Sequence, residues 1–223
     1  MVVRHISISV CMDVPNSIKI FHILHIDRLS SILSQGFIFS DSYIRNSVIE
    51  GTTIGMSKIK ETRLSKRLSK YPDLTVGDCT PFYFCPRSVM LYMIYKGNHI
   101  EISYRGGQNP IIHIVADFHR VIEWAQRENK RWVFTPTNAA ASYAEDFNDL
   151  AMLSEINWDV VNSDDWKENR GQKQAEFLIE HSFPIGLIEK IGVYSEKYAR
   201  QVTELLSHYN LIIDVTIEPN WYY

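Results

Sequence analysis

The stretch Gly171-Gln172-Lys173-Gln174-Ala175-Glu176-Phe177-Leu178-Ile179 places one carboxylate between a polar segment and three apolar residues. If this stretch is a strand, successive side chains point to opposite faces, so Glu176 lies on the face opposite Phe177 and Ile179. A carboxylate held on a rigid strand beside a cleft can bind a sugar hydroxyl or accept a proton. The same pattern also occurs on half-buried edge strands, where the glutamate is only solvated. The stretch alone therefore leaves a catalytic and a structural interpretation open.

The rest of the chain predicts an α+β fold, with short helices around a mixed sheet. Strands and helices follow one another without regular βαβ spacing, and no glycine-rich phosphate loop follows a strand, which argues against a Rossmann or P-loop domain. No repeat, low-complexity tract or flexible linker divides the sequence, so we expect residues 1–223 to form one domain. We expect the other strands at residues 18–23, 81–85, 111–116, 131–135, 191–194 and 211–217, and helices at residues 27–36, 57–70, 88–97, 117–128 and 197–208.

The composition argues against several classes of protein. Hydrophobic residues make up 45% and charged residues 22%, as in ordinary globular domains. No apolar run approaches the ~20 residues that span a bilayer, and residues 1–11 carry too many polar side chains for a signal peptide. The three cysteines, Cys11, Cys79 and Cys85, form no C-x-x-C pair, which argues against a disulfide framework and a cysteine zinc site. We therefore expect a cytoplasmic protein that holds no metal.

The charge is unevenly distributed, although the net charge is only −3. Between residues 58 and 70 the only acid is Glu61, whereas residues 145–165 carry acids and no Lys or Arg. A basic segment in an acidic protein can guide a polyanion to one face, but a solvated helix would explain the same pattern. The cations of the basic segment are Lys58, Lys60, Arg63, Lys66, Arg67 and Lys70.

Two further segments carry side chains that suit a nucleotide pocket. The run Phe82-Tyr83-Phe84-Cys85-Pro86-Arg87-Ser88 combines aromatic faces with a guanidinium and a helix N-terminus, which together can stack a planar ring and bind an anion. An aromatic core strand with Arg87 in a salt bridge explains this run at least as well. His22 and His25 lie at the end of a predicted strand, where a hydrogen bond to backbone or ligand is a better interpretation than a metal site.

Taken in order, these segments resemble the DarT family of DNA ADP-ribosyltransferase toxins. The resemblance extends from about residue 20 to the C-terminus, and the chain departs from the family pattern at Thr62, Cys79-Thr80 and Val89. It rests on the runs Phe21-His22-Ile23-Leu24-His25-Ile26-Asp27, Thr80-Pro81-Phe82-Tyr83-Phe84-Cys85-Pro86-Arg87-Ser88-Val89-Met90-Leu91-Tyr92, Gly106-Gly107-Gln108, Lys173-Gln174-Ala175-Glu176-Phe177-Leu178 and Trp221-Tyr222-Tyr223.

The resemblance implies the ADP-ribosyltransferase fold and transfer of ADP-ribose from NAD, used as a substrate, to a base of single-stranded DNA, with thymine favoured over guanine. It implies Glu176 as the catalytic glutamate and Arg63 as the second catalytic residue, with Arg67 as the neighbouring alternative. It also implies a DarG-type antitoxin whose macrodomain removes the modification. The expected NAD-binding residues are His22, His25, Phe82, Tyr83, Phe84, Arg87 and Tyr92, and the expected DNA-binding residues are Lys58, Lys60, Lys66 and Arg67.

Two other classes of function stay open at this point. An NAD-dependent transferase that modifies protein or RNA would keep Glu176 and His22 but would not need the basic segment. A single-strand binding module without catalysis would tolerate the loss of Glu176. We expect Glu176→Ala to abolish DNA modification while leaving the fold largely intact.

Overall fold

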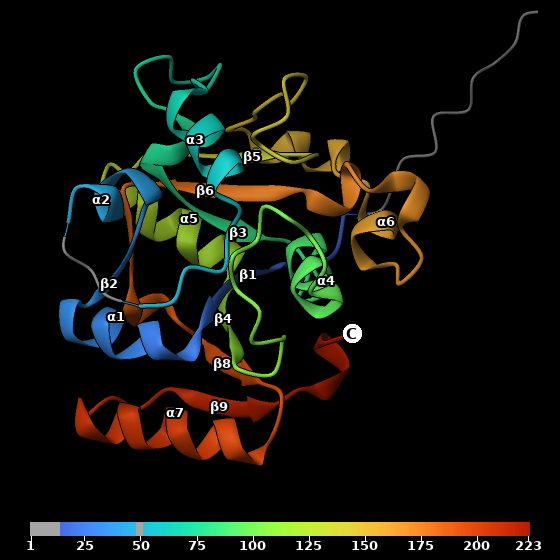
Figure 1. Ribbon diagram of the computed structural model, residues 1–223. Helices are drawn as coiled ribbons and strands as arrows, with labels where there is room; N and C mark the ends of the chain where they lie inside the picture. Colours follow the sequence, from blue (N-terminus) through green and yellow to red (C-terminus); the bar gives the residue numbers. More distant parts are fainter. Residues whose placement is uncertain (1–13, 48–50) are drawn as a thin grey trace, which may run out of the picture.

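The computed structural model describes residues 14–47 and 51–223, and its centre is a seven-stranded sheet (Figure 1). The strand order is β5-β6-β3-β1-β4-β8-β9, in which β8 and β9 are parallel and all other neighbours are antiparallel. This mixed sheet confirms the predicted α+β class. The strands are β1 (Lys19–His25), β3 (Cys79–Tyr83), β4 (Ile111–Asp117), β5 (Trp132–Thr135), β6 (Glu176–Glu180), β8 (Lys190–Val193) and β9 (Asp214–Ile217). A second, two-stranded sheet pairs β2 (Phe37–Phe39) with β7 (Ser182–Pro184).

Short helices surround the main sheet, and local capping chemistry sets several of their ends. The Ser88 hydroxyl accepts the Leu91 N–H and the Asp117 carboxylate accepts the Arg120 N–H, so these two residues cap the N-termini of the helices expected at 88–97 and 117–128. Gly36 and Gly97 end two helices in the left-handed conformation that glycine adopts without strain. The helices are α1 (Leu29–Gln35), α2 (Asp41–Arg45), α3 (Ser57–Ser65), α4 (Val89–Lys96), α5 (Phe118–Arg127), α6 (Trp158–Asn162) and α7 (Glu196–His208).

Strand β6 lies inside the sheet, between β3 and β5, and every one of its residues is buried. Phe177 and Ile179 enter the large core on one face of the sheet, whereas Leu178 packs with Val133 and Leu68 on the other face. The predicted alternation is therefore correct, and Glu176 lies on the face opposite Phe177. The alternative of a solvated glutamate on an edge strand is wrong, because β6 has a neighbour on each side.

The basic segment forms a shorter helix than predicted. Helix α3 ends at Ser65, and Lys66 is already extended, with φ −78° and ψ 115°. The Val76 N–H then bonds to the Lys66 carbonyl and the Leu68 N–H to the Leu74 carbonyl. The reason is burial, since Leu68, Leu74 and Val76 together cover the face of the sheet that carries Leu178.

The last three residues fasten the loop before β4 to the body of the protein. The Tyr223 N–H donates to the side-chain oxygen of Gln108 at 3.0 Å, and the Tyr223 hydroxyl donates to the Arg87 carbonyl at 2.9 Å. The Tyr222 hydroxyl donates to the Ile111 carbonyl at 2.7 Å. The terminal tyrosines and the Gly-Gly-Gln turn are thus bonded to each other, although they are separate in the sequence.

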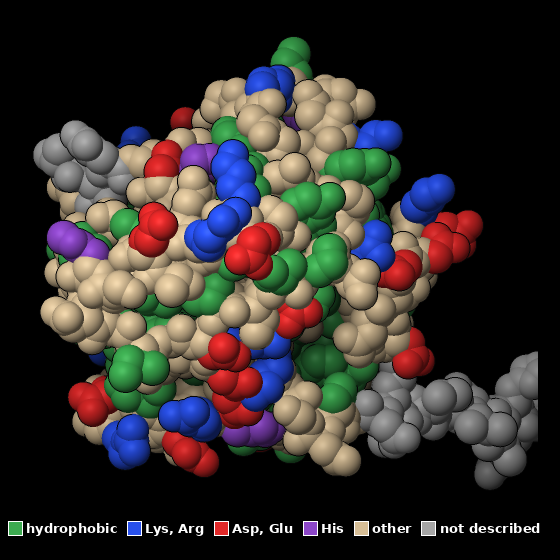
Figure 2. Space-filling model, turned by 90° about the horizontal axis from the view of Figure 1, so that it is seen from below, with side chains coloured by type: hydrophobic (Ala, Val, Ile, Leu, Met, Phe, Trp, Pro, Cys, Tyr) green, Lys and Arg blue, Asp and Glu red, His purple; other side chains and the backbone are tan. Residues whose placement is uncertain are grey.

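The face around α7 and β9 mixes charges of both signs. Figure 2, which views the molecule from below, shows acidic and basic side chains interspersed there with hydrophobic ones. Ile212 and Ile217 are among the exposed hydrophobic residues. The described part of this face thus offers no continuous basic surface for a polyanion.

Membrane spans, cysteines and the N-terminal segment were the remaining subjects of the sequence expectations. Within residues 14–47 and 51–223, no helix is long and apolar enough to cross a membrane. Cys79 and Cys85 are free and buried. The signal-peptide interpretation of residues 1–11, and Cys11 itself, lie outside the described residues.

The buried imidazole of His113, on β4, predicts a pH dependence of stability. Its Nε2–H donates to the Pro86 carbonyl at 3.0 Å and its Nδ1 has no partner among the described residues. Burial lowers the pKa of His113 to about 4, although the bond to Pro86 acts in the opposite direction. Below pH ~6.5 the His113 imidazole therefore binds a proton in the unfolded chain but stays neutral in the folded protein. The folded state thus loses stability as the pH falls from ~6.5 towards 4.

We expect the free energy of unfolding to fall more steeply over this range in the wild type than in His113→Phe, by up to about 3 kcal/mol. Urea titrations at a series of pH values measure both slopes. Equal slopes would mean that His113 is protonated in the folded protein.

Candidate active site

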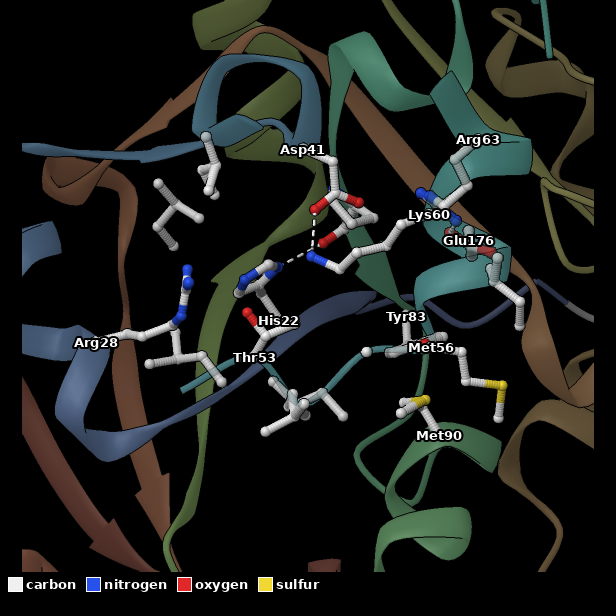
Figure 3. A pocket seen from close by; sticks show the side chains of 18 of the residues that line it. His22, Arg28, Asp41, Thr53, Met56, Lys60, Arg63, Tyr83, Met90 and Glu176 are labelled. Carbon is white, nitrogen blue, oxygen red and sulfur yellow. Dashed lines mark hydrogen bonds and ion pairs between the residues drawn. The ribbon is translucent and has the colours of Figure 1, made fainter. Parts of the chain in front are cut away.

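A cavity of about 400 Å³ opens beside β1 and β3, where the main sheet splits (Figure 3). β1 pairs with β4 from Lys19 to His25, but it pairs with β3 at one position, Phe21 opposite Tyr83. Pro81 has no N–H to continue the ladder, and its carbonyl instead accepts the Nδ1–H of His22 at 2.7 Å. The cavity wall comes from β1, α1, the 52–56 segment, α3, β3, α4 and the residues before β6.

Glu176 lies in the wall of this cavity and is held through both carboxylate oxygens. Arg63, on α3, donates from Nη1 to Oε2 at 2.8 Å, and the backbone N–H of Ala139 donates to Oε1 at 3.0 Å. The Glu176 side chain is 3% exposed and that of Arg63 is 8% exposed. Two charges at this depth are tolerable because they pair with each other, so the pair fixes the position of the carboxylate.

Glu176 stabilises the positive charge of Arg63. Burial alone would lower the pKa of Arg63, but the charge and the hydrogen bond of Glu176 raise it above its ordinary value. The second terminal nitrogen, Nη2, is buried and has no hydrogen-bond partner among the described residues. Arg63 therefore has a donor left over for a substrate atom that enters the cavity.

A loop on the far side of Glu176 supplies the Ala139 N–H. Asn138 donates to the side-chain oxygen of Gln174 at 3.1 Å, and the Asn138 side chain accepts the Ala140 N–H at 2.8 Å. Lys66 donates to the Ala141 carbonyl. These bonds hold the loop against the carboxylate, and they tie the residues after α3 to it.

His22 and Tyr83 face the cavity near its middle. Because the Pro81 carbonyl can only accept, His22 Nδ1 carries the proton and Nε2 is left as an acceptor. Burial lowers the pKa of His22, so the ring is neutral at pH 7. Burial, and then the charge of Glu176, raise the pKa of Tyr83, so its phenol stays protonated. Both side chains thus offer neutral, oriented groups for a sugar or a base.

The structure brings only part of the expected NAD-binding set to the cavity. His22 and Tyr83 line it, but Phe82 and Phe84 do not, because alternation along β3 turns them into the opposite core. There Phe82 contacts Phe183, and Phe84 contacts Phe118 and Trp158, so the expectation of a whole aromatic lining is corrected to Tyr83.

The three remaining residues of that set also point elsewhere. His25 accepts the Asp27 N–H and lies 2.9 Å from its carboxylate. Arg87 pairs with Asp164 at 2.7 Å and lies over the Tyr223 ring. Tyr92 packs edge-on against Trp166 and Tyr223. Tyr92 lies on the face of α4 that points away from the cavity, whereas Met90 and Met93 on the same helix line the cavity.

The four expected DNA-binding cations are separated in space. Lys58 is exposed, whereas Lys60 lines the cavity and pairs with Asp41 at 2.7 Å. Arg67 donates to the Pro72 carbonyl at 2.6 Å, and Lys66 is engaged with Ala141. The segment is therefore not one uniform basic face, because the helix ends before Lys66.

Several cavity residues were not predicted from the sequence. Arg28, Asp41 and Asn138 lie in short elements or turns without a periodic pattern, so they carry no individual signal. Gln174 and Lys173 belong to the stretch around Glu176, but no role was assigned to them. Lys173 is 2% exposed and donates to the Val161 and Ser163 carbonyls. These bonds connect the segment before Glu176 to the C-terminal end of α6.

The burial of the Glu176–Arg63 pair revises the expectation that Glu176→Ala leaves the fold largely intact. Removing one partner leaves a buried charge unpaired, so we expect either single alanine variant to lose about 3 kcal/mol of stability or more. The double variant, Arg63→Ala with Glu176→Ala, should lose clearly less than the sum of the two singles. Urea denaturation of the four proteins measures this.

Glu218→Ala provides the control, since its pair with Lys190 is 27% exposed on each side and should be worth less than about 1 kcal/mol. Additive losses in the double variant would contradict the proposed dependence of each charge on the other.

Comparisons with known proteins agree with this geometry. The family profile described as "ssDNA thymidine ADP-ribosyltransferase, DarT" matches residues 21–223. The DNA ADP-ribosyl transferase of Thermus sp. (strain 2.9) is 35% identical over 214 residues, which is 94% of this chain and 98% of the relative. The resemblance inferred from the sequence, and with it the enzyme class and the preference for thymine, is confirmed.

Solved structures extend the likeness to three dimensions. Thermus sp. 2.9 DarT in complex with ADP-ribosylated ssDNA superposes with a TM-score of 0.84 at 34% identity, covering 94% of this chain and 98% of that one. The same protein in complex with NAD+ gives 0.81 at 32% identity, covering 95% and 100%. Thermosipho africanus DarTG in complex with ADP-ribose, at 19% identity and a TM-score of 0.69, shares the fold over 92% of this chain and 50% of its own. The chain belongs to the DarT family of ssDNA thymidine ADP-ribosyltransferases.

Proposed function

We propose that this chain transfers ADP-ribose from NAD+ to thymine in single-stranded DNA, with Glu176 and Arg63 as its catalytic residues. The observation that supports these roles best is the carboxylate of Glu176, held in a cavity wall by Arg63 and the Ala139 N–H. The structures of Thermus sp. 2.9 DarT with NAD+ and with ADP-ribosylated ssDNA supply the substrates by similarity.

The reaction breaks the bond between nicotinamide and the ribose, and the electron pair of that bond leaves with nicotinamide. The sugar carbon becomes positively charged, and a ring nitrogen of thymine attacks it. A fixed carboxylate lowers the energy of such a state by binding a ribose hydroxyl, and it can accept the proton that the ring nitrogen loses. The Nη2 group of Arg63, which has no hydrogen-bond partner among the described residues, can donate to the carbonyl oxygen of a base that is becoming anionic.

Neutral groups near the middle of the cavity orient the sugar. His22 Nε2 is an acceptor that can take a hydrogen bond from a ribose hydroxyl, because its Nδ1–H is committed to Pro81. Tyr83 remains a phenol and provides an aromatic face beside it. Positioning of this kind lowers the entropic part of the barrier without any covalent enzyme intermediate.

Single-stranded DNA is the accessible form, because base pairing hides the thymine nitrogen that must attack. The cations of the basic segment point in different directions, which limits their joint contribution to DNA binding. Of the expected DNA-binding residues on α3, Lys58 is the exposed one. We further infer a toxin of a toxin–antitoxin pair that acts in the cytoplasm as a single domain. Its partner would be a DarG-type antitoxin, by similarity to Thermosipho africanus DarTG.

We expect wild-type protein with NAD+ to add one ADP-ribose mass to a thymine-containing single strand, as measured by mass spectrometry of the DNA. Glu176→Gln should lower the rate by about a hundred-fold or more, because the glutamine cannot accept the proton or carry the charge. Arg63→Ala should lower turnover similarly, whereas Arg67→Ala on the same segment should retain most of it. Melting curves must first show that each variant is folded.

Two substrate controls complete this test. The same strand annealed to its complement should react roughly a hundred-fold more slowly, since extruding a paired base costs a few kcal/mol. A strand that keeps guanine but lacks thymine should gain no mass. Near-normal activity in folded Glu176→Gln would remove Glu176 from the reaction, and modification of the thymine-free strand would overturn the choice of base.

A further inference from the structure

The ion pair between Lys60 and Asp41 crosses the wall of the cavity. Lys60 Nζ lies 2.7 Å from Asp41 Oδ1, and both side chains line the cavity. The pair is partly open to solvent, with 34% of the lysine and 19% of the aspartate side chain exposed. Figure 3 shows the lysine pointing away from Arg63 and Glu176 and towards His22.

A second cation faces the same space from the opposite side. Arg28 lines the cavity and donates from Nε to the Thr52 carbonyl at 3.0 Å and from Nη2 to the Gly51 carbonyl at 3.3 Å. These acceptors are neutral, and no carboxylate within the described ranges forms a salt bridge with Arg28. Among the described residues its positive charge is therefore not paired with an acid, and His22 lies between Arg28 and Lys60 (Figure 3).

We propose that the diphosphate of NAD+ binds between Arg28 and Lys60, and that Lys60 leaves Asp41 to make this contact. Asp41 then competes with the dinucleotide for the lysine, so the ion pair lowers the affinity of the cavity for the diphosphate. This inference rests on the proposed function, because it assigns the middle part of the same NAD+ site. It moves Lys60 from the expected DNA-binding set to the binding of the dinucleotide.

The charges of the cavity favour this assignment over the other cations. The Arg63 charge is balanced by Glu176 at 2.8 Å, within a buried pair that cannot be opened cheaply. Lys60 is on a flexible stem in a half-exposed pair, and pairs of this kind are weak enough to exchange. When Lys60 turns away, Asp41 keeps access to water. A diphosphate carries two negative charges, which Arg28 and Lys60 together would neutralise.

Competition predicts opposite effects for the two members of the pair. Lys60→Met keeps the apolar stem and removes the charge, so we expect at least tenfold weaker binding of carba-NAD+, which the enzyme cannot cleave. Asp41→Asn frees the lysine, so we expect about fivefold tighter binding, equivalent to about 1 kcal/mol. Calorimetric titration of carba-NAD+ and of ADP-ribose, which retains the diphosphate, measures both effects.

The matched controls are Lys60→Arg, which should restore binding to within a few-fold, and Lys58→Met on the exposed side of the same helix, which should leave carba-NAD+ affinity unchanged. In turnover experiments Lys60→Met should raise KM for NAD+ while changing kcat less than twofold. Weaker binding in both Lys60→Met and Asp41→Asn would show a structural pair and overturn the inference, as would unchanged binding in Lys60→Met. If the wild type itself failed to bind carba-NAD+, the proposed function would fall with it.

Discussion

The buried ion pair between Arg63 and Glu176 is the interaction on which the rest of the site depends. It joins α3 to the first residue of β6 across 113 positions of sequence, and it fixes where the chain must go on both sides. The carboxylate also takes the Ala139 N–H, so the 138–141 loop is held by the same group. Two charges buried this deeply cost free energy unless each has its partner, so each of the two side chains depends on the other. The carboxylate of Glu176 thus connects α3, the 138–141 loop and β6.

A second constraint places an opening beside that carboxylate. A proline in β3 cannot donate to β1, so the sheet separates at Pro81 and His22 bonds to the released carbonyl. The strand that carries Tyr83 towards the cavity sends Phe82 into the opposite core, where aromatic packing makes the sheet rigid. The opening and its rigid support therefore come from neighbouring residues of one strand. In our account the ion pair of Lys60 and Asp41 then competes with the diphosphate that binds in this space.

The sequence predicted features that depend on neighbouring residues, and it did not predict features that depend on contacts between distant segments. The alternation around Glu176 and the positions of α4 and α5 follow from local chemistry, and these were predicted. The end of α3 was not, because Leu68 leaves the helix to cover Leu178, a residue more than a hundred positions away. Alternation applied to β3 would have separated Tyr83 from Phe82 and Phe84. By contrast, no local pattern marks Asp41, Arg28 or Asn138, which the fold brings to one cavity from three separate segments.

The most direct test of the central claim is a crystal structure of the protein with carba-NAD+ and a short thymine-containing single strand. Our account predicts the ribose carbon that bears nicotinamide and the reacting thymine nitrogen about 3–3.5 Å apart, the separation of a reactive pair. The Glu176 carboxylate should lie within hydrogen-bond reach, roughly 2.6–3.2 Å, of a ribose hydroxyl or of that nitrogen. A dinucleotide bound elsewhere, or one whose ribose is beyond the reach of Glu176 and Arg63, would contradict the account.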